Sequence, residues 1–209
     1  MAKTWATKCC PGTYKNNYQL CCGIKDEDIV RMFHSGNGEE KAFRLLVGKY
    51  SERLYWHIRK IVIGHEDSDD VLQNTFIKIW KGLREFRYEA KLFTWMYRVA
   101  TNEAINFLSE KRRKTYGNSQ EITPVLENQL ESDSFFCGDS IQQELQKAVL
   151  KLPERQRLVF NMKYFDDMKY EDIAEVLDVA VGTLKATYHN AVKKIEESLK
   201  ISDTLPSFE

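Results

Sequence analysis

The chain has 209 residues, of which 43% are hydrophobic and 30% are charged, and its 31 basic and 31 acidic residues cancel. This composition is typical of a soluble globular protein with one domain or two small ones, and no apolar run is long enough to span a bilayer. The N-terminus lacks the apolar core of a signal peptide, so we expect a cytoplasmic protein. Glycine and proline are scarce, with 10 and 4 residues, which favours an all-α fold.

Four of the five cysteines lie close to the N-terminus, in the segment CCPGTYKNNYQLCC. Zinc sites usually place ligands two to four residues apart within each half, and no histidine lies nearby. We therefore expect residues 1–23 to form a disordered, reduced leader rather than a metal site. We also expect no cofactor, since the sequence contains no P-loop and no pattern typical of a metal cluster or a nucleophile–base pair.

The zero net charge is the sum of two oppositely charged blocks. Residues 84–114 contain eight cations and four anions, whereas residues 119–145 contain six carboxylates and no lysine or arginine. For a protein that binds nucleic acid, the distribution of charge matters more than its sum. The balance of charge therefore does not exclude that class.

A helical pattern begins near Lys25, and residues 39–62 carry apolar side chains at three- and four-residue steps, as an amphipathic helix does. The segment GHEDSDD interrupts this pattern, and either Asp67 or Ser68 is suited to cap the next helix. The apolar face of that helix comprises Val71, Leu72, Phe76, Ile79 and Leu83. A short loop at RYEAK then leads to a third long helix at residues 93–114, FTWMYRVATNEAINFLSEKRRK.

The third helix has two distinct faces. Arg98, Asn102 and Asn106 recur at four-residue steps on one side. Asparagine is mildly unfavourable inside a helix, and its amide can hydrogen-bond a base, so this face is either a solvated surface or a nucleic-acid contact. The segment by itself leaves both interpretations open. The opposite side is an apolar core stripe of Phe93, Tyr97, Ala100, Ala104 and Phe107.

Residues 115–138 show no sustained period and are rich in serine, asparagine and acidic residues, which indicates a mostly extended, flexible acidic linker. Helical patterns resume near Asp139 and continue to Ile201, and no alternation typical of a strand appears. We therefore predict an all-α protein with two small helical domains, at residues 24–114 and 139–201, and a tail at residues 202–209.

Residues 170–195, YEDIAEVLDVAVGTLKATYHNAVKKI, have the layout of a helix-turn-helix. The small Ala174 allows the two helices to cross closely, and Val179 fills the turn. Asp178 stands where such turns often have glycine, and aspartate tolerates the left-handed conformation that the turn requires. The polar face of the second helix would enter the major groove of DNA. It carries Thr183, Lys185, Thr187, His189, Asn190, Lys193 and Lys194. The alternative is a plain helical hairpin with a solvated polar face.

Three segments in this order, DSDDVLQNTFIKIWKGLREF, FTWMYRVATNEAINFLSEKRR and the helix-turn-helix, resemble the bacterial extracytoplasmic-function (ECF) sigma factors. The resemblance covers about residues 26–199 and implies a cytoplasmic bacterial protein of two domains that directs transcription initiation. It implies that residues 24–114 match sigma region 2 and residues 139–201 match sigma region 4. It also implies that the helix at residues 70–80 docks on the β′ clamp helices of core RNA polymerase. Its polar face carries Asp70, Gln73, Asn74 and Lys78.

In this family, region 2 melts and reads the −10 promoter element and captures a flipped base, and region 4 reads the −35 element and contacts the β flap. The resemblance therefore implies that the face seen on the third helix belongs to the −10 reader, together with the loop before it. The implied −10 residues are Arg87, Tyr88, Lys91, Arg98, Asn102, Asn106, Lys111, Arg112 and Arg113. The linker matches a segment that threads the RNA exit path, and family members commonly have an anti-sigma factor as partner. The resemblance implies no membrane insertion of the chain itself.

One departure from the family concerns the recognition helix, where members commonly carry an Arg-rich or Ser-containing run and this chain has Lys185, Ala186 and Thr187. Two other functions remain alternatives. A one-component regulator would bind duplex DNA through the helix-turn-helix alone, and a sigma-mimicking adapter would bind proteins without binding DNA. The basic faces count against the adapter, and the asparagine-bearing helix counts against the regulator. An enzyme is the least supported class.

Overall fold

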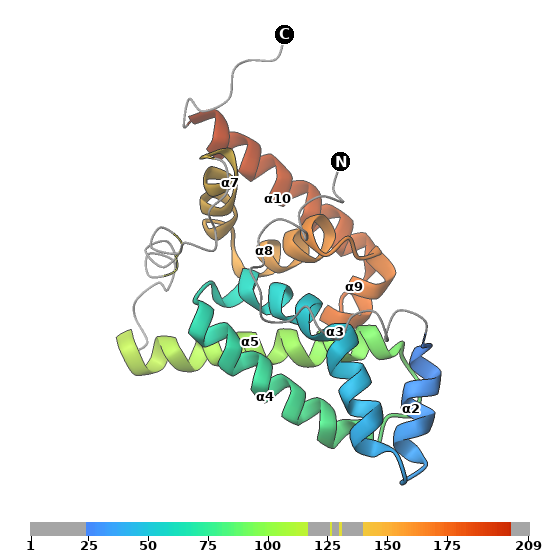
Figure 1. The fold of residues 1–209 in the computed structure, drawn as a ribbon. Helices are drawn as coiled ribbons and strands as arrows, with labels where there is room; N and C mark the ends of the chain where they lie inside the picture. Colours follow the sequence, from blue (N-terminus) through green and yellow to red (C-terminus); the bar gives the residue numbers. More distant parts are fainter. Residues whose placement is uncertain (1–23, 117–125, 127–129, 131–139, 202–209) are drawn as a thin grey trace.

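In a computed structural model, the described residues are 24–116, 126, 130 and 140–201, and they contain helices and no strand. The N-terminal part comprises α2 (Asp26–His34), α3 (Glu39–Val62), α4 (His65–Leu83) and α5 (Leu92–Tyr116). The C-terminal part comprises α7 (Ser140–Leu150), α8 (Glu154–Phe160), the π-helical turn η3 (Asn161–Phe165), α9 (Tyr170–Leu177) and α10 (Val181–Ile201). Figure 1 shows the C-terminal helices stacked on the N-terminal bundle. The predicted all-α fold class is confirmed.

The N-terminal bundle forms around α3, which contacts α2, α4 and α5. The apolar stripe predicted for residues 39–62 is the buried face of this helix, with Leu46, Leu54 and Ile58 fully buried. Trp80 of α4 closes one end of the bundle, because its ring meets Phe33 and Phe43 edge-on at 5.1 and 4.9 Å. Amphipathic periodicity therefore places these helices correctly.

The start of α4 differs from the prediction. The helix begins at His65 with Gly64 as its N-cap, and Asp67 and Ser68 lie inside the first turn instead of capping it. Ser68 is fully buried and its hydroxyl donates to the carbonyl of Gly64 at 2.6 Å. Ile63, with φ of 68°, reverses the chain just before the helix, so the turn needs fewer residues than expected. Glu66 and Asp67 still lie in the first turn, where carboxylates favour the positive end of the helix dipole.

The helical segment at residues 154–165 has two conformations. It is α-helical to Phe160 and then widens into the π-helical turn, so that Tyr164 stacks on Phe160 at 5.2 Å. Phe160 also stacks on Tyr188 of α10 at 5.9 Å. A π turn inserts one extra residue per turn and rotates the following side chains. Here it is followed by Asp166, which points towards α3.

Leu126 and Leu130 are the two described residues of the predicted linker. Both are helical and buried, and both belong to the main hydrophobic core. An extended path was expected there, but burial of these two apolar side chains in the core stabilises helical backbone at both positions. The other residues between 117 and 139 lie outside the described part of the chain.

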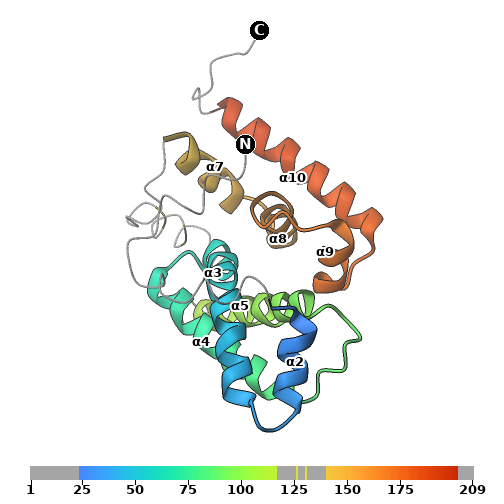
Figure 2. The same ribbon diagram turned by 45° about the vertical axis from the view of Figure 1, so that its right-hand side comes forward.

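The two halves of the chain share one hydrophobic core. Residues from α2 to α5 and residues from α8, η3, α9 and α10 belong to the same cluster of buried side chains. Helix α9 packs against α5, and η3 contacts α3. Figure 2, turned by 45°, also shows α9 close to α5. Within the described residues, no helix is both long and apolar enough to cross a membrane.

Candidate nucleic-acid interface

The helix-turn-helix forms as its residue spacing predicts, with α9 as the first helix and α10 as the second. Asp178 ends α9 in the left-handed conformation, with φ of 53° and ψ of 50°. The N–H of Val179 donates to the carbonyl of Ala174 at 3.1 Å, and the Val179 side chain packs on the core. The expectation that aspartate accommodates the turn is confirmed.

The polar face of α10 is open to solvent. Its buried side consists mainly of Leu184, Ala191 and Ile195, and Tyr188 is half-buried against Phe160. Every residue predicted for the −35 face is exposed except Thr187, which is half-buried. The exposed residues are Thr183, Lys185, His189, Asn190, Lys193 and Lys194. The hydroxyl of Thr187 donates to the carbonyl of Thr183 at 2.7 Å, which orients it along the helix.

The residues predicted to bind polymerase form one exposed face of α4, with Val71 and Ile79 buried on the other side. They are Asp70, Gln73, Asn74 and Lys78. Ile77 lies on the same side and is 53% exposed, and sequence analysis did not include this apolar residue in the face. Its position outside the predicted apolar face of this helix could have indicated that it is exposed. Lys78 forms an ion pair with Glu103 of α5, so this face is joined to the helix that carries the asparagines.

The asparagines of α5 are both exposed, whereas Arg98 is half-buried. Thr94 and Thr101 are buried on the core side of the helix. The predicted core stripe holds in its middle, because Tyr97, Ala100 and Ala104 are buried, but Phe93 and Phe107 at its ends are half-buried.

The basic end of α5 is partly engaged within the protein. Lys111 forms an ion pair with Asp67 of α4, and Lys114 pairs with Glu110 at 3.7 Å. Arg112 and Arg113 are exposed. Among the described residues neither arginine has an ion-pair partner, so these two exposed cations are the ones available for the predicted phosphate contacts at this end of the helix.

The loop between α4 and α5 is built on aromatic side chains. Phe86 is buried between Trp95 of α5, at 5.2 Å, and Tyr88, at 5.3 Å. Tyr88 has a φ of 60°, and its hydroxyl donates to the carbonyl of Glu27 at 3.2 Å. Partial burial raises the pKa of Tyr88, so it stays a neutral hydrogen-bonding ring. Arg87 is exposed beside it. The loop is thus a braced aromatic platform with a cation on its surface.

Lys91, the last predicted residue of this loop, contacts the C-terminal half of the chain. Its Nζ lies 2.7 Å from Oδ1 of Asp172 in α9. The Asp172 carboxylate raises the pKa of the Lys91 ammonium, which remains a cation. Sequence analysis missed this partner because it lies far along the chain.

Among the residues that the structure describes, no group of three or more His, Cys, Asp or Glu side chains is placed to hold a metal ion. The cysteine-containing segment at residues 1–23 lies outside the described part. The interpretation of that segment as a leader therefore stays a prediction.

The family comparisons match both halves of the chain. The model of sigma-70 region 2 matches residues 46–114, and the model of sigma-70 region 4 matches residues 142–195. The ECF RNA polymerase sigma-E factor of Haemophilus influenzae is 30% identical over 186 residues, covering 85% of this chain and 96% of that protein. The RNA polymerase sigma-H factor of Pseudomonas aeruginosa is 30% identical over 192 residues, covering 84% and 94%.

Two solved structures have a similar fold. One is CnrH in complex with the cytosolic domain of CnrY, with a TM-score of 0.61 and 22% identity, covering 86% of this chain and 99% of that one. The other is the sigma factor RpoE in complex with the anti-sigma factor NepR from Bartonella quintana, with a TM-score of 0.60 and 22% identity, covering 77% and 98%.

A helix-turn-helix whose second helix leaves its polar face open to solvent is typical of transcription proteins that bind DNA. The chain belongs to the ECF family of RNA polymerase sigma factors, and its function is promoter-specific initiation of transcription. Sigma factors act as non-enzymatic initiation factors.

Proposed function

We propose that three exposed faces of the chain divide the work of initiation among core polymerase, the −10 element and the −35 element. The observation that carries this proposal is that nearly all the predicted contact residues are exposed or half-exposed on three separate surfaces of an otherwise well-packed protein. Exposed polar residues that do not contribute to the core are free to bind a partner. The chain needs no catalytic residue or cofactor for this work.

The polymerase face consists of Asp70, Gln73, Asn74 and Lys78, with Ile77 at its centre, and it binds the β′ clamp helices. An exposed isoleucine surrounded by polar residues is the usual anatomy of a protein interface, in which an apolar centre is ringed by a polar rim. The ion pair between Lys78 and Glu103 supports this arrangement by holding α4 and α5 in register.

The −10 face consists of the loop and the outer side of α5. Arg87, Tyr88 and Lys91 surround the flipped base, since aromatic rings stack on bases of a single strand. Asn102 and Asn106 hydrogen-bond base edges, and Arg98 stands beside them. Lys111, Arg112 and Arg113 contact the phosphates. Stabilising the opened strand over the duplex lowers the free energy of promoter melting.

The −35 face is the exposed side of α10. Asn190 reads a base edge, and Thr183, Thr187 and His189 lie where they contact bases or phosphates. Lys185, Lys193 and Lys194 neutralise phosphates. Lys185 also lies 5.9 Å from the centre of the Tyr170 ring, which supports an orientation at the start of the recognition helix.

The partners we propose are core RNA polymerase, through its β′ clamp helices and β flap, promoter DNA and an anti-sigma factor. The fold of this chain is similar to that of the sigma factor RpoE, whose solved structure is a complex with the anti-sigma factor NepR, and this similarity supports an anti-sigma partner. We propose a bacterial cytoplasmic location, with region 2 at residues 24–114, a linker at 115–138 and region 4 at 139–201. The leader at 1–23 and the tail at 202–209 lie outside both domains.

Two sets of substitutions, each expected to affect only one of two activities, test these assignments. Asn102→Ala removes an exposed side chain, so we expect unchanged binding to core polymerase and promoter melting weakened by about 5- to 150-fold, the equivalent of about 1–3 kcal/mol for a side-chain–base pair. Gln73→Ala together with Asn74→Ala should weaken core binding instead. Core binding is measured by fluorescence anisotropy and melting by permanganate footprinting.

Equal loss of core binding in Asn102→Ala would make that residue structural and overturn the −10 assignment. A wild-type protein that binds core polymerase but initiates at no promoter would favour the sigma-mimicking adapter. Binding to duplex promoter DNA without any need for core polymerase would favour the one-component regulator.

A further inference from the structure

A chain of polar side chains leads from α3 to the start of the polymerase face on α4. His65 is the first residue of α4, and its Nδ1 lies 2.7 Å from the hydroxyl oxygen of Tyr55 in α3. The other ring nitrogen, Nε2, lies 3.7 Å from Oδ2 of Asp69, one helical turn further along α4. The rings of Tyr55 and His65 meet edge-on, with their centres 6.0 Å apart. One imidazole therefore connects α3 to a carboxylate of α4.

Arg59 determines the direction of the hydrogen bonds in this chain. It is fully buried, and its guanidinium hydrogen-bonds Tyr55. A guanidinium has N–H donors and no acceptor, so the Tyr55 oxygen accepts from Arg59 and donates its own proton to Nδ1 of His65. Neutral His65 therefore carries its proton on Nε2, the atom that faces Asp69. Each member of the chain thus presents a donor to the next.

Asp69 lies on the same side of α4 as the polymerase face. Gln73 and Ile77 of that face are four and eight positions further along, and side chains at four-residue steps lie one above the other on a helix. The Asp69 side chain is 40% exposed, and the neighbouring Asp70 is exposed as well. Sequence analysis gave Asp69 no role. Two carboxylates therefore occupy this end of the face.

The ionisable groups near His65 come from three helices. They are Tyr55 and Arg59 of α3, Glu66, Asp67 and Asp69 of α4, and Lys111 of α5. Burial lowers the pKa of the Arg59 guanidinium, and the nearby carboxylates of Asp69 and Asp67 oppose this, so the group stays a cation. Asp67 is engaged by Lys111. The carboxylate that faces the imidazole is that of Asp69.

The charge on His65 changes what Asp69 offers to a partner. Histidine is the side chain whose charge ordinarily changes between about pH 5 and 8. When the imidazole is neutral, Nε2–H orients the Asp69 carboxylate, which keeps its full negative charge. When the imidazole is protonated, it forms an ion pair with Asp69 and competes with any cation that a partner brings. Nδ1 then becomes a donor too, so the hydroxyl proton of Tyr55 has to turn away.

We propose that Tyr55 and His65 position the Asp69 carboxylate for binding to a cationic group of core polymerase, and that protonation of His65 weakens this binding. A cationic partner fits this end of α4, because Asp69 and Asp70 place two negative charges there. The affinity for core polymerase therefore falls as the pH falls. This inference rests on the proposed polymerase face.

The test measures the affinity of the full chain for core RNA polymerase at about pH 6, 7 and 8 by fluorescence anisotropy. Wild type and His65→Gln are compared on the same polymerase, so that titration of the polymerase itself cancels. Glutamine keeps an amide donor and does not titrate. Between pH 8 and pH 6, the dissociation constant of the wild type should rise about two- to fivefold more than that of His65→Gln, the range expected for an exposed ion pair.

Two further variants test the other members of the chain. Asp69→Asn should lose the same pH-dependent component, and combining it with His65→Gln should add nothing further, because the two residues act through one contact. Tyr55→Phe leaves the imidazole without its orienting hydroxyl, so core binding at pH 8 should weaken by about twofold. Circular dichroism verifies that each variant is folded. If Tyr55→Phe fails to fold, the two variants in α4 still decide.

His34→Gln is the matched control. His34 is the last residue of α2, and its Nε2 donates to the carbonyl of Leu83 at 2.9 Å, at the opposite end of α4 from His65. The chemical change is the same, but it lies outside the chain that leads to Asp69. His34→Gln should therefore keep the full pH dependence of the wild type.

Three results would overturn the inference. The first is the same pH dependence in wild type and His65→Gln, and the second is a wild-type pH dependence in Asp69→Asn. The third is a wild-type affinity that rises, relative to His65→Gln, as the pH falls. A failure of the proposed function looks different, because core binding at pH 8 would then be unchanged when Gln73→Ala and Asn74→Ala are combined.

Discussion

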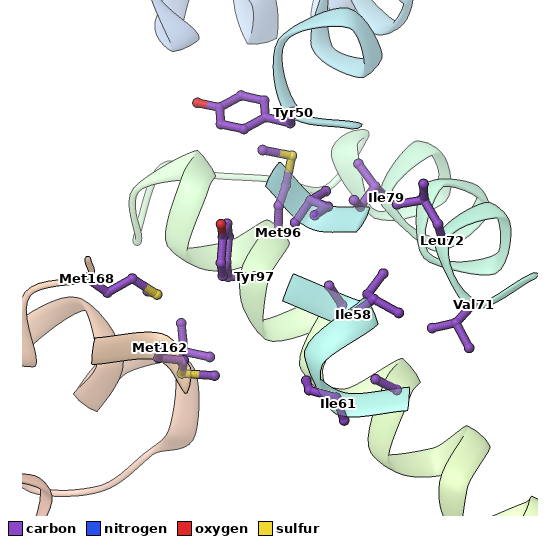
Figure 3. Close-up of a cluster of buried hydrophobic side chains, with 14 of the residues drawn as sticks. Tyr50, Ile58, Ile61, Val71, Leu72, Ile79, Met96, Tyr97, Met162 and Met168 are labelled. Atoms are coloured by element: carbon purple, nitrogen blue, oxygen red, sulfur yellow. The ribbon is translucent and has the colours of Figure 1, made fainter. Parts of the chain in front are cut away.

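Met162→Ala should weaken the junction between the domains without affecting the fold of region 2. Met162 is 0% exposed and lies beside Tyr97 and Met168 (Figure 3). Truncation removes the side chain beyond Cβ, and the neighbours include residues of both domains. The loss should therefore appear in overall stability and in the docking of the two halves.

The expected magnitude follows from the volume removed. Loss of the apolar atoms costs about 1.5–2 kcal/mol of transfer free energy. A residual cavity of roughly 60 Å³ adds about 1.5 kcal/mol at about 24 cal/mol per Å³. The free energy of unfolding should fall by about 3 kcal/mol. Because part of the contact lies within region 4, the docking equilibrium should shift by about 1–3 kcal/mol, or roughly 5- to 150-fold.

Urea unfolding followed by circular dichroism measures the first quantity. The yield of carbodiimide cross-linking between Lys91 and Asp172, which lie 2.7 Å apart in different halves of the chain, measures the second. Met96→Ala is the matched control, because Met96 is also 0% exposed and belongs to the same cluster but lies in α5 within region 2. It should cost similar stability and leave the cross-link much closer to the wild-type yield. Met162→Leu preserves volume and should change either quantity by less than about 1.5 kcal/mol.

A loss of unfolding free energy below about 1 kcal/mol for Met162→Ala would refute the packing argument. An equal drop in cross-link yield for Met96→Ala and Met162→Ala would refute the assignment of Met162 to the junction, because it would make docking a passive consequence of overall stability.

Three further predictions concern the turn, the buried carboxylate and the recognition helix. Asp178→Gly should raise the unfolding free energy by up to about 1 kcal/mol and Asp178→Val should lower it, since the left-handed φ suits glycine and disfavours a β-branched residue; equal midpoints in urea would contradict this. The pKa of Asp166 is lower in the folded protein than in the unfolded chain, where it is about 4. The charged carboxylate therefore stabilises the folded state fully above about pH 4, and this stabilisation is lost as the pH falls through the folded pKa. The stability gap between wild type and Asp166→Asn should therefore be constant from about pH 5 to 8 and narrow below about pH 4, and a gap that changes near neutrality would assign the effect to another group. Lys193→Gln and Lys194→Gln should each reduce the slope of log binding constant against log salt concentration by about 1, without changing the preferred promoter sequence. Fluorescence anisotropy at several salt concentrations measures this slope. A changed sequence preference would instead show that these lysines contact bases.

Much of the fold was predictable because it depends on local patterns. The bounds of α3 and α9 follow from apolar periodicity and from the turn residues beside them. The αL conformation of Asp178 follows from the few residue types that tolerate positive φ. The predicted start of α4 was wrong. Ile63 and Gly64 reverse the chain before this helix, and no side chain caps it, so the sequence contains no capping residue at the true start.

The candidate faces were predictable to the same extent. The sides of α5 and α10 that sequence spacing separates into apolar and polar are largely buried and exposed in the structure. The partners of the charged residues were not predictable. Lys91 meets Asp172, Lys111 meets Asp67 and Lys78 meets Glu103, and each pair joins different helices or a loop and a helix.

The sequence by itself therefore determined the helices, the helix-turn-helix and the polar faces, because helical spacing decides which side chains share a surface. Only the tertiary structure decided that the two domains dock on each other. The contacts of Asp166 with His57 and Lys60 span 109 and 106 residues, and no local pattern encodes a pairing at that distance. Such a pairing depends on how two apolar surfaces pack against each other. Asp166, His57 and Lys60 come into contact only when that packing brings them together.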